Sequence, residues 1–124
     1  MDKLAINFNQ LDEDLKKKIQ QFQQIQTNLE YIINQRIQLE TRLRETELAV
    51  EELEKTGSDE IIYKSIGGIM VKSERDKLLA EKKSQKTSLE MKIKTLKQKE
   101  ERARGQIENM TKSIQSDLQQ QQAM

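Results

Sequence analysis

The chain has 124 residues, of which 34% are hydrophobic and 35% are charged, with two Phe, two Tyr and no Trp. So little bulky apolar surface cannot fill the compact core of a globular domain of this length, whereas long helices need only a narrow apolar seam. The 22 basic and 21 acidic residues nearly cancel, so the chain lacks the strongly basic character of a nucleic-acid-binding protein.

An apolar stripe predicts a first helix from about residue 5 to about residue 56. Its members recur at alternating steps of three and four, as in a heptad. They are Leu4, Phe8, Leu11, Leu15, Phe22, Ile25, Leu29, Ile32, Leu39, Leu43, Val50 and Leu53. Gly57 is expected to end the helix in the left-handed conformation, which glycine adopts without strain.

A β-rich segment over about residues 60–72 predicts a hairpin after this helix. Two runs of bulky or β-branched residues lie on either side of Gly67 and Gly68, which suit a tight turn. The runs consist of Ile61, Ile62 and Tyr63, and of Ile69, Met70 and Val71.

A second stripe predicts a helix from about residue 74 to about residue 118. It consists of Leu79, Leu89, Ile93, Leu96, Ala103, Ile107, Met110 and Ile114. Ser73 with Asp76 resembles a helix-capping signature at its start. The remaining residues, 119–124, are mostly glutamine and are expected to form a frayed tail.

The hairpin connection predicts that the two helices form a long antiparallel coiled coil, with residue numbers in matched layers summing to about 129. Leu39 would then face Leu89, and Val50 would face Leu79. Several polar residues occupy seam positions, where their long stems can lie on apolar surface while their heads reach water. They could instead fix the register or keep the arms flexible. These residues are Lys18, Arg36, Thr46, Lys82, Lys86 and Glu100.

The hairpin itself predicts a partner. An isolated two-stranded hairpin is marginal in water, and its edges offer unpaired N–H and C=O groups to further strands. Ile61 and Tyr63 lie on one face and Ile62 on the other, so both faces need cover. We therefore expect an oligomer assembled through residues 60–72; the alternative is a turn that packs on its own helices.

The segment from Glu60 to Lys72, placed between two helices of similar length, resembles the central hairpin of the β-class subunits of prefoldin. The residues that carry this likeness are Tyr63, Lys64, Gly67 and the run Ile69-Met70-Val71. The glutamine-rich stretch 20–26 is similar to the first helix of the family. One hairpin, rather than two, matches the β class and not the α class.

The resemblance implies an ATP-independent chaperone that needs no cofactor. In that family two α and four β subunits join their hairpins into a double β-barrel from which six coiled-coil arms project. The arm tips hold non-native client proteins and deliver them to a group II chaperonin. On this chain the six apolar hairpin residues named above would form the barrel.

The resemblance places client contact at the distal tips, where both chain ends lie. Helix ends far from the assembly point can separate at low cost and expose their seam side chains to apolar clients. The tip residues are Leu4, Ile6, Phe8, Leu11, Met110, Ile114, Leu118 and Met124. For Leu11, Leu15 and Ile114, ordinary coiled-coil core is the favoured interpretation.

Other functions fit the residues less well. The chain has no His, no Cys and no glycine-rich phosphate loop, so neither an enzyme nor a metal site is expected. No apolar run approaches the ~20 residues that span a bilayer, and the first residues do not resemble a signal peptide, so we expect a soluble, cytoplasmic protein. A structural scaffold or tether is the main alternative, although it would not need the hairpin. A nucleic-acid-binding arm would need a basic stripe, which acidic residues interrupt here.

Overall fold

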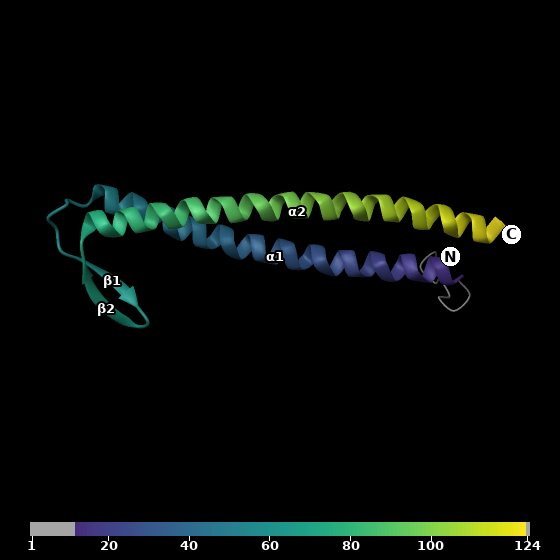
Figure 1. Ribbon diagram of the computed structural model, residues 1–124, viewed down its shortest axis with the longest axis horizontal. Coiled ribbons are helices and arrows are strands. Elements are labelled where there is room, and N and C mark those ends of the chain that lie inside the picture. The colour runs from purple at the N-terminus through teal and green to yellow at the C-terminus, as the bar shows by residue number, and fades with distance from the viewer. Residues whose placement is uncertain (1–11, 124) are drawn as a thin grey trace, which may run out of the picture. The chain divides into compact units, whose positions relative to one another are not determined.

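Two helices and two strands account for the described part of the chain, residues 12–123, in the computed structural model (Figure 1). Helix α1 spans Glu13–Lys55, strand β1 Ile62–Ile66, strand β2 Ile69–Ser73 and helix α2 Arg75–Ala123. The predicted layout of two long helices joined by one hairpin is confirmed. Residues 5–11, which we expected to begin the first helix, lie outside the described residues.

Helix α1 begins at an acidic cap. The Asp12 carboxylate accepts a hydrogen bond from the Leu15 backbone N–H at 2.7 Å, and the Asp12 carbonyl accepts one from the Lys16 N–H at 3.0 Å. Glu13 and Asp14 place negative charge in the first turn, where it complements the helix dipole. These contacts satisfy N–H groups that the first turn leaves without a partner in the helix.

The end of α1 differs from the prediction. Gly57 has no positive φ, so the expected left-handed cap at this glycine is wrong. Instead, Arg75 at the start of α2 donates from Nε to the Leu53 carbonyl at 2.8 Å and from Nη2 to the Glu54 carbonyl at 3.3 Å. A guanidinium from a later element therefore satisfies carbonyls that the last helical turn leaves free.

The hairpin turns at Gly67 and Gly68, whose φ values are +53° and +86°. Two consecutive positive φ angles in a two-residue loop are the mark of a type I′ turn, whose twist matches that of paired strands. The strands pair antiparallel from Ile62 opposite Ser73 to Ile66 opposite Ile69. The turn therefore sets the register that decides which side chains share a face.

Helix α2 differs from the prediction at both ends. Ser73 belongs to β2, and the carbonyl of Glu74, not of Ser73, accepts the first helical hydrogen bond, from Leu78 N–H at 3.0 Å. The helix also continues to Ala123, through residues 119–122 that we expected to fray. Glutamine has good helix propensity, and no Gly or Pro interrupts this stretch.

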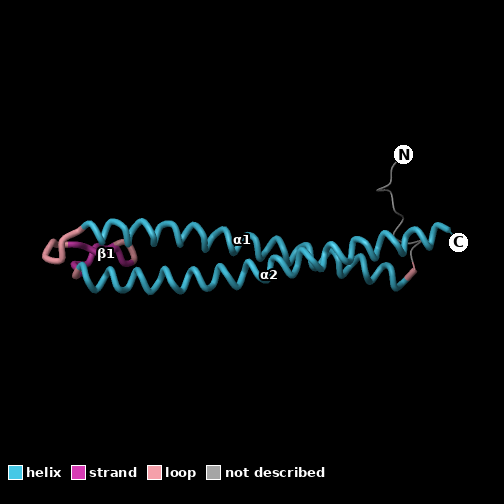
Figure 2. Tube along the Cα trace, turned by 90° about the horizontal axis from the view of Figure 1, so that it is seen from above, coloured by secondary structure: helices cyan, strands magenta, loops and turns pink. Residues whose placement is uncertain are grey.

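The described chain divides into two units. One combines the residues up to Ile33 with those from Gln98 onward, and the other spans Asn34–Lys97 and contains the hairpin. In each unit a segment of α1 lies beside a segment of α2 (Figures 1 and 2). Figure 2 shows both strands at the loop end of the helical segments in the second unit.

The apolar seam supplies most buried side chains of both units. The first unit buries Leu15, Ile32 and Ala103, and its helices are joined by Lys18 Nζ, which donates to Ser113 Oγ at 2.8 Å and pairs with Asp117. The second unit buries Val50, Leu78, Leu79 and Ile93. A narrow seam of this kind is the core that the composition allows.

Polar residues at the seam find partners or reach water. Thr46 is buried, and its hydroxyl donates to the Arg42 carbonyl at 2.8 Å. Arg36 is largely covered and pairs with Glu40 at 3.1 Å. Covered stems with paired heads match the expectation that these side chains extend along the seam toward water.

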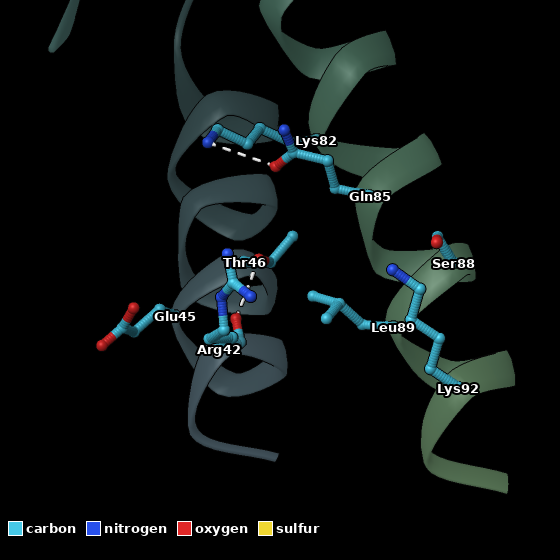
Figure 3. A pocket seen from close by; sticks show the side chains of 8 residues that line it. All are labelled: Arg42, Glu45, Thr46, Lys82, Gln85, Ser88, Leu89 and Lys92. Carbon is cyan, nitrogen blue, oxygen red and sulfur yellow. Dashed lines mark hydrogen bonds between the residues drawn. The ribbon is translucent and has the colours of Figure 1, made fainter. Parts of the chain in front are cut away.

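The predicted register of facing seam residues stays a prediction. Leu89, expected opposite Leu39, lines a hollow together with Arg42 and Thr46 (Figure 3). Leu39 lines a neighbouring hollow with Met91 and Leu96. Residues 56–61 form an irregular connection between α1 and the hairpin.

Candidate functional site

The hairpin exposes more large apolar side chains than any other element of the described chain. Tyr63 is 56% exposed, Met70 66% and Ile61, just before β1, 65%. Ile69 and Val71 are also exposed, and Ile62 is half-buried. Monomeric proteins rarely leave so much contiguous apolar surface uncovered, so this segment is a candidate interface.

Both faces of the hairpin are apolar. Opposed residues in an antiparallel pair share a face. Ile62, Ile66, Ile69 and Val71 therefore lie on one face with Lys64 and Ser73. Tyr63 and Met70 lie on the other with Ser65 and Lys72. The predicted two-sided apolar character is present in the structure.

One ion pair ties the hairpin to a helix. Lys64 Nζ of β1 donates to Glu81 Oε1 of α2 at 2.5 Å, and each side chain is about one-third exposed. The hydrogen bond from Lys64 lowers the pKa of the Glu81 carboxyl from its ordinary value of 4.5, with further help from the nearby charges of Lys82 and Lys77. The pair holds the first of the two faces, the one bearing Lys64, near α2.

The predicted client-binding residues lie partly outside the described chain. Leu4, Ile6, Phe8, Leu11 and Met124 are outside the described residues. Met110, Ile114 and Leu118 lie on α2 and are each half-buried. These three can contact both the partner helix and a bound chain, so their role in client binding stays a prediction.

Some exposed apolar residues were not predicted as site residues. Ile66, at 49% exposure, extends the apolar face of β1 and could have been found from the strand alternation beyond Tyr63. Tyr31, Leu48 and Met91 are exposed on the helices and lie off the two heptad stripes. Their exposure depends on how each helix is rotated about its own axis, and the apolar stripe defines that rotation only roughly.

Other kinds of site find no support in the described residues. Between residues 12 and 123, no group of three or more acidic side chains lies close enough together to hold a metal ion. In the same part of the chain, neither helix is long and apolar enough to cross a membrane.

Comparison with known proteins agrees with the geometry. The family model for prefoldin subunits matches residues 5–121. The chain belongs to the prefoldin family. The prefoldin β subunit of Archaeoglobus fulgidus is 35% identical over 109 residues, which cover 88% of this chain and 94% of the relative. The β subunit of Pyrobaculum islandicum is 36% identical, with 88% and 87% covered.

A solved prefoldin structure shares the fold. The crystal structure of the prefoldin β subunit from Thermococcus strain KS-1 aligns with a TM-score of 0.77 at 27% identity, covering 85% of this chain and 92% of that one. The predictions of a β-class prefoldin fold and of a prefoldin chaperone subunit are therefore confirmed. Membership also supports an oligomeric state in which this chain is one subunit.

Proposed function

We propose that this chain is the β-class subunit of an ATP-independent cytoplasmic holdase, without enzymatic activity of its own. Two α-class and four β-class subunits would assemble through their hairpins, hold non-native proteins at the arm tips and deliver them to a group II chaperonin. The observation that carries the proposal is the hairpin, which is apolar on both faces and exposed in the single chain.

Strand pairing between subunits accounts for the hairpin's chemistry. Among residues 12–123 the sheet has two strands, so within this range both of its outer edges present backbone groups without a strand partner. Pairing these edges with other hairpins would satisfy the backbone and cover both apolar faces at once. Burial of apolar surface contributes roughly 25 cal/mol per Å², so covering several Ile, Met and Tyr side chains would stabilise such an assembly.

Client contact at the tips is supported by the division of the chain into two units. Residues before Ile33 and after Gln98 belong to one unit, and the assembly hairpin belongs to the other. In this proposal, client contact and the subunit interface therefore use residues of different units. Met110 adds a flexible, polarisable side chain that suits varied partners.

The test uses the purified chain with a co-expressed α-class subunit. The assembled complex should suppress the light scattering of a chemically denatured client during dilution, without ATP. If the complex forms but client aggregation proceeds unchanged, the holdase proposal is wrong and a structural scaffold becomes the better explanation.

A further inference from the structure

A cationic hollow lies between α1 and α2 in the unit that spans Asn34–Lys97 (Figure 3). Its volume is about 450 Å³, within the range of about 300–1,000 Å³ common for ligand sites. Arg42 lines it from α1, and Lys82 and Lys92 line it from α2. Gln85 and Ser88 add polar groups that can donate hydrogen bonds.

The charge of this hollow is only partly compensated. Within residues 12–123, no carboxylate forms an ion pair with Arg42 or Lys92. Lys82 donates to Gln85 Oε1 at 3.4 Å, and its charge helps to lower the pKa of the Glu81 carboxyl. Glu45 is the single acidic residue at the rim, and Figure 3 shows its carboxylate turned away from α2. The site therefore presents three cations to an incoming anion.

Neighbouring cations of the same unit are paired across the helices. Lys83 Nζ lies 3.6 Å from a carboxylate oxygen of Glu54, and Lys97 Nζ lies 4.0 Å from one of Glu40. Acidic partners are thus present on α1 both before and after the hollow. At the hollow itself, by contrast, the basic side chains of α2 form no ion pair with a carboxylate of α1 among the described residues.

An apolar hollow adjoins the cationic one. Leu39, Met91 and Leu96 line it, its volume is about 360 Å³, and Lys92 belongs to both hollows. Met91 is 67% exposed, so its flexible side chain can rearrange around different partners. The cationic hollow and the apolar hollow therefore adjoin at Lys92.

We propose that these six residues, Leu39, Arg42, Lys82, Met91, Lys92 and Leu96, form a second binding strip for non-native proteins, separate from the arm tips. Its occupant is an extended segment in which acidic and apolar side chains alternate or adjoin. The acidic side chains pair with the three cations, and the apolar ones lie on Leu39, Met91 and Leu96. This inference rests on the proposed chaperone function and adds a preference for one class of client segment.

The strip suits weak and reversible binding. Exposed ion pairs are each worth about 0–1 kcal/mol and are screened by salt, so several must act together. A small apolar hollow adds affinity without holding the client tightly. A holdase that must release its client gains from such contacts.

The test measures peptide binding to the complete assembly by fluorescence anisotropy. The probe is a short fluorescent peptide of Glu, Leu and Ser, compared with one carrying Lys for Glu and one carrying Ser for Leu. The double variant Arg42→Glu with Lys92→Glu should weaken binding of the first peptide by about tenfold or more. The matched control, Arg44→Glu with Lys94→Glu, reverses two exposed charges outside both hollows and should change the Kd less than about twofold.

Several results of the peptide-binding measurement would overturn the proposed binding strip. Equal weakening by both double variants, or no weakening by either, overturns it. Undiminished binding of the Ser-for-Leu peptide, with displacement by inorganic polyphosphate, would show a simple anion site and also overturn it. If the charge-reversed chain does not assemble, Arg42→Gln with Lys92→Gln and, separately, Met91→Ser replace it, each with a several-fold weakening expected.

Failure of this inference differs from failure of the proposed function. An assembly that suppresses client aggregation but binds all peptides alike keeps its chaperone function and loses the strip. An assembly that does not suppress aggregation contradicts the chaperone proposal whatever the peptides do.

Discussion

At the residue scale, single side chains decide where the hairpin sits and how it turns. Lys64 connects β1 to Glu81 on α2, and Arg75 connects the start of α2 to the last carbonyls of α1. Both contacts join positions distant in sequence, so neither could be predicted from local patterns. The glycine pair of the turn, in contrast, was predictable because two-residue hairpin loops need positive φ angles.

The Lys64–Glu81 pair predicts a pH dependence of hairpin docking. Because the pKa of Glu81 is lowered in the folded state, the stabilisation is fully present above the ordinary value of 4.5. It is lost as the pH falls through the lowered folded-state pKa. Carboxyl-detected NMR should show the Glu81 midpoint rising in Lys64→Met. An unchanged midpoint in this variant would contradict the assigned contact.

The turn predicts a contrast between two substitutions of Gly67. A Cβ at this position would meet nothing within 4 Å, so only the backbone conformation matters. Gly67→Asn should be tolerated because Asn adopts left-handed conformations, whereas Gly67→Val should cost on the order of 1–2 kcal/mol. Urea unfolding of the assembled complex would separate the two. Equal stability of both variants would show that the turn does not hold this φ.

At Gly105, in contrast to Gly67, replacement of the glycine should stabilise the protein. Gly105 lies exposed inside α2, has no positive φ, and a Cβ there would meet nothing within 4 Å. Gly105→Ala should therefore stabilise the helix by about 0.8–1 kcal/mol. A higher midpoint in thermal unfolding, followed by circular dichroism, would confirm it, and a lower midpoint would show that this position needs glycine.

At the element scale, the hairpin and the helices perform different tasks. The helices bury their seam within the chain, while the hairpin leaves Ile61, Tyr63 and Met70 exposed. We therefore propose that another subunit covers the apolar surface of the hairpin. Disrupting it should remove assembly and leave helix content unchanged.

Tyr63→Asp tests this division, and Tyr31→Asp is its matched control. The two tyrosines are similarly exposed, at 56% and 60%, but Tyr31 belongs to α1 and not to the hairpin. Tyr63→Asp should place a charge in the subunit interface and prevent assembly with the α-class subunit, with helical circular dichroism retained. Tyr31→Asp should assemble normally. Loss of assembly in both variants would contradict the proposal that assembly depends on the hairpin.

The elements were largely predictable from the sequence, and their ends were not. Heptad stripes indicated both helices because the apolar period is intrinsic to each helix. The end of α1 depends on Arg75, twenty or so residues later, which no local pattern of α1 indicates. The cationic hollow likewise arises only when α1 and α2 are placed together.

At the scale of the whole molecule, we propose that assembly and client binding use different units of the chain. The hairpin lies in one unit and the predicted tip residues in the other. Removing residues 1–8 together with 119–124 should therefore leave the mass of the assembly unchanged apart from the deleted residues. Client holding should fall, because apolar contact surface is lost. If the truncation abolished assembly, the proposed division of tasks would be wrong.

The central claim is that the hairpin joins this chain to an α-class subunit, and light-scattering mass measurement tests it most directly. The chain would be measured alone and after co-expression with an α-class prefoldin subunit. The account predicts a discrete hetero-oligomer near six chains in the second sample. A stable homodimer that ignores the α-class subunit would contradict it and would favour a structural coiled-coil scaffold.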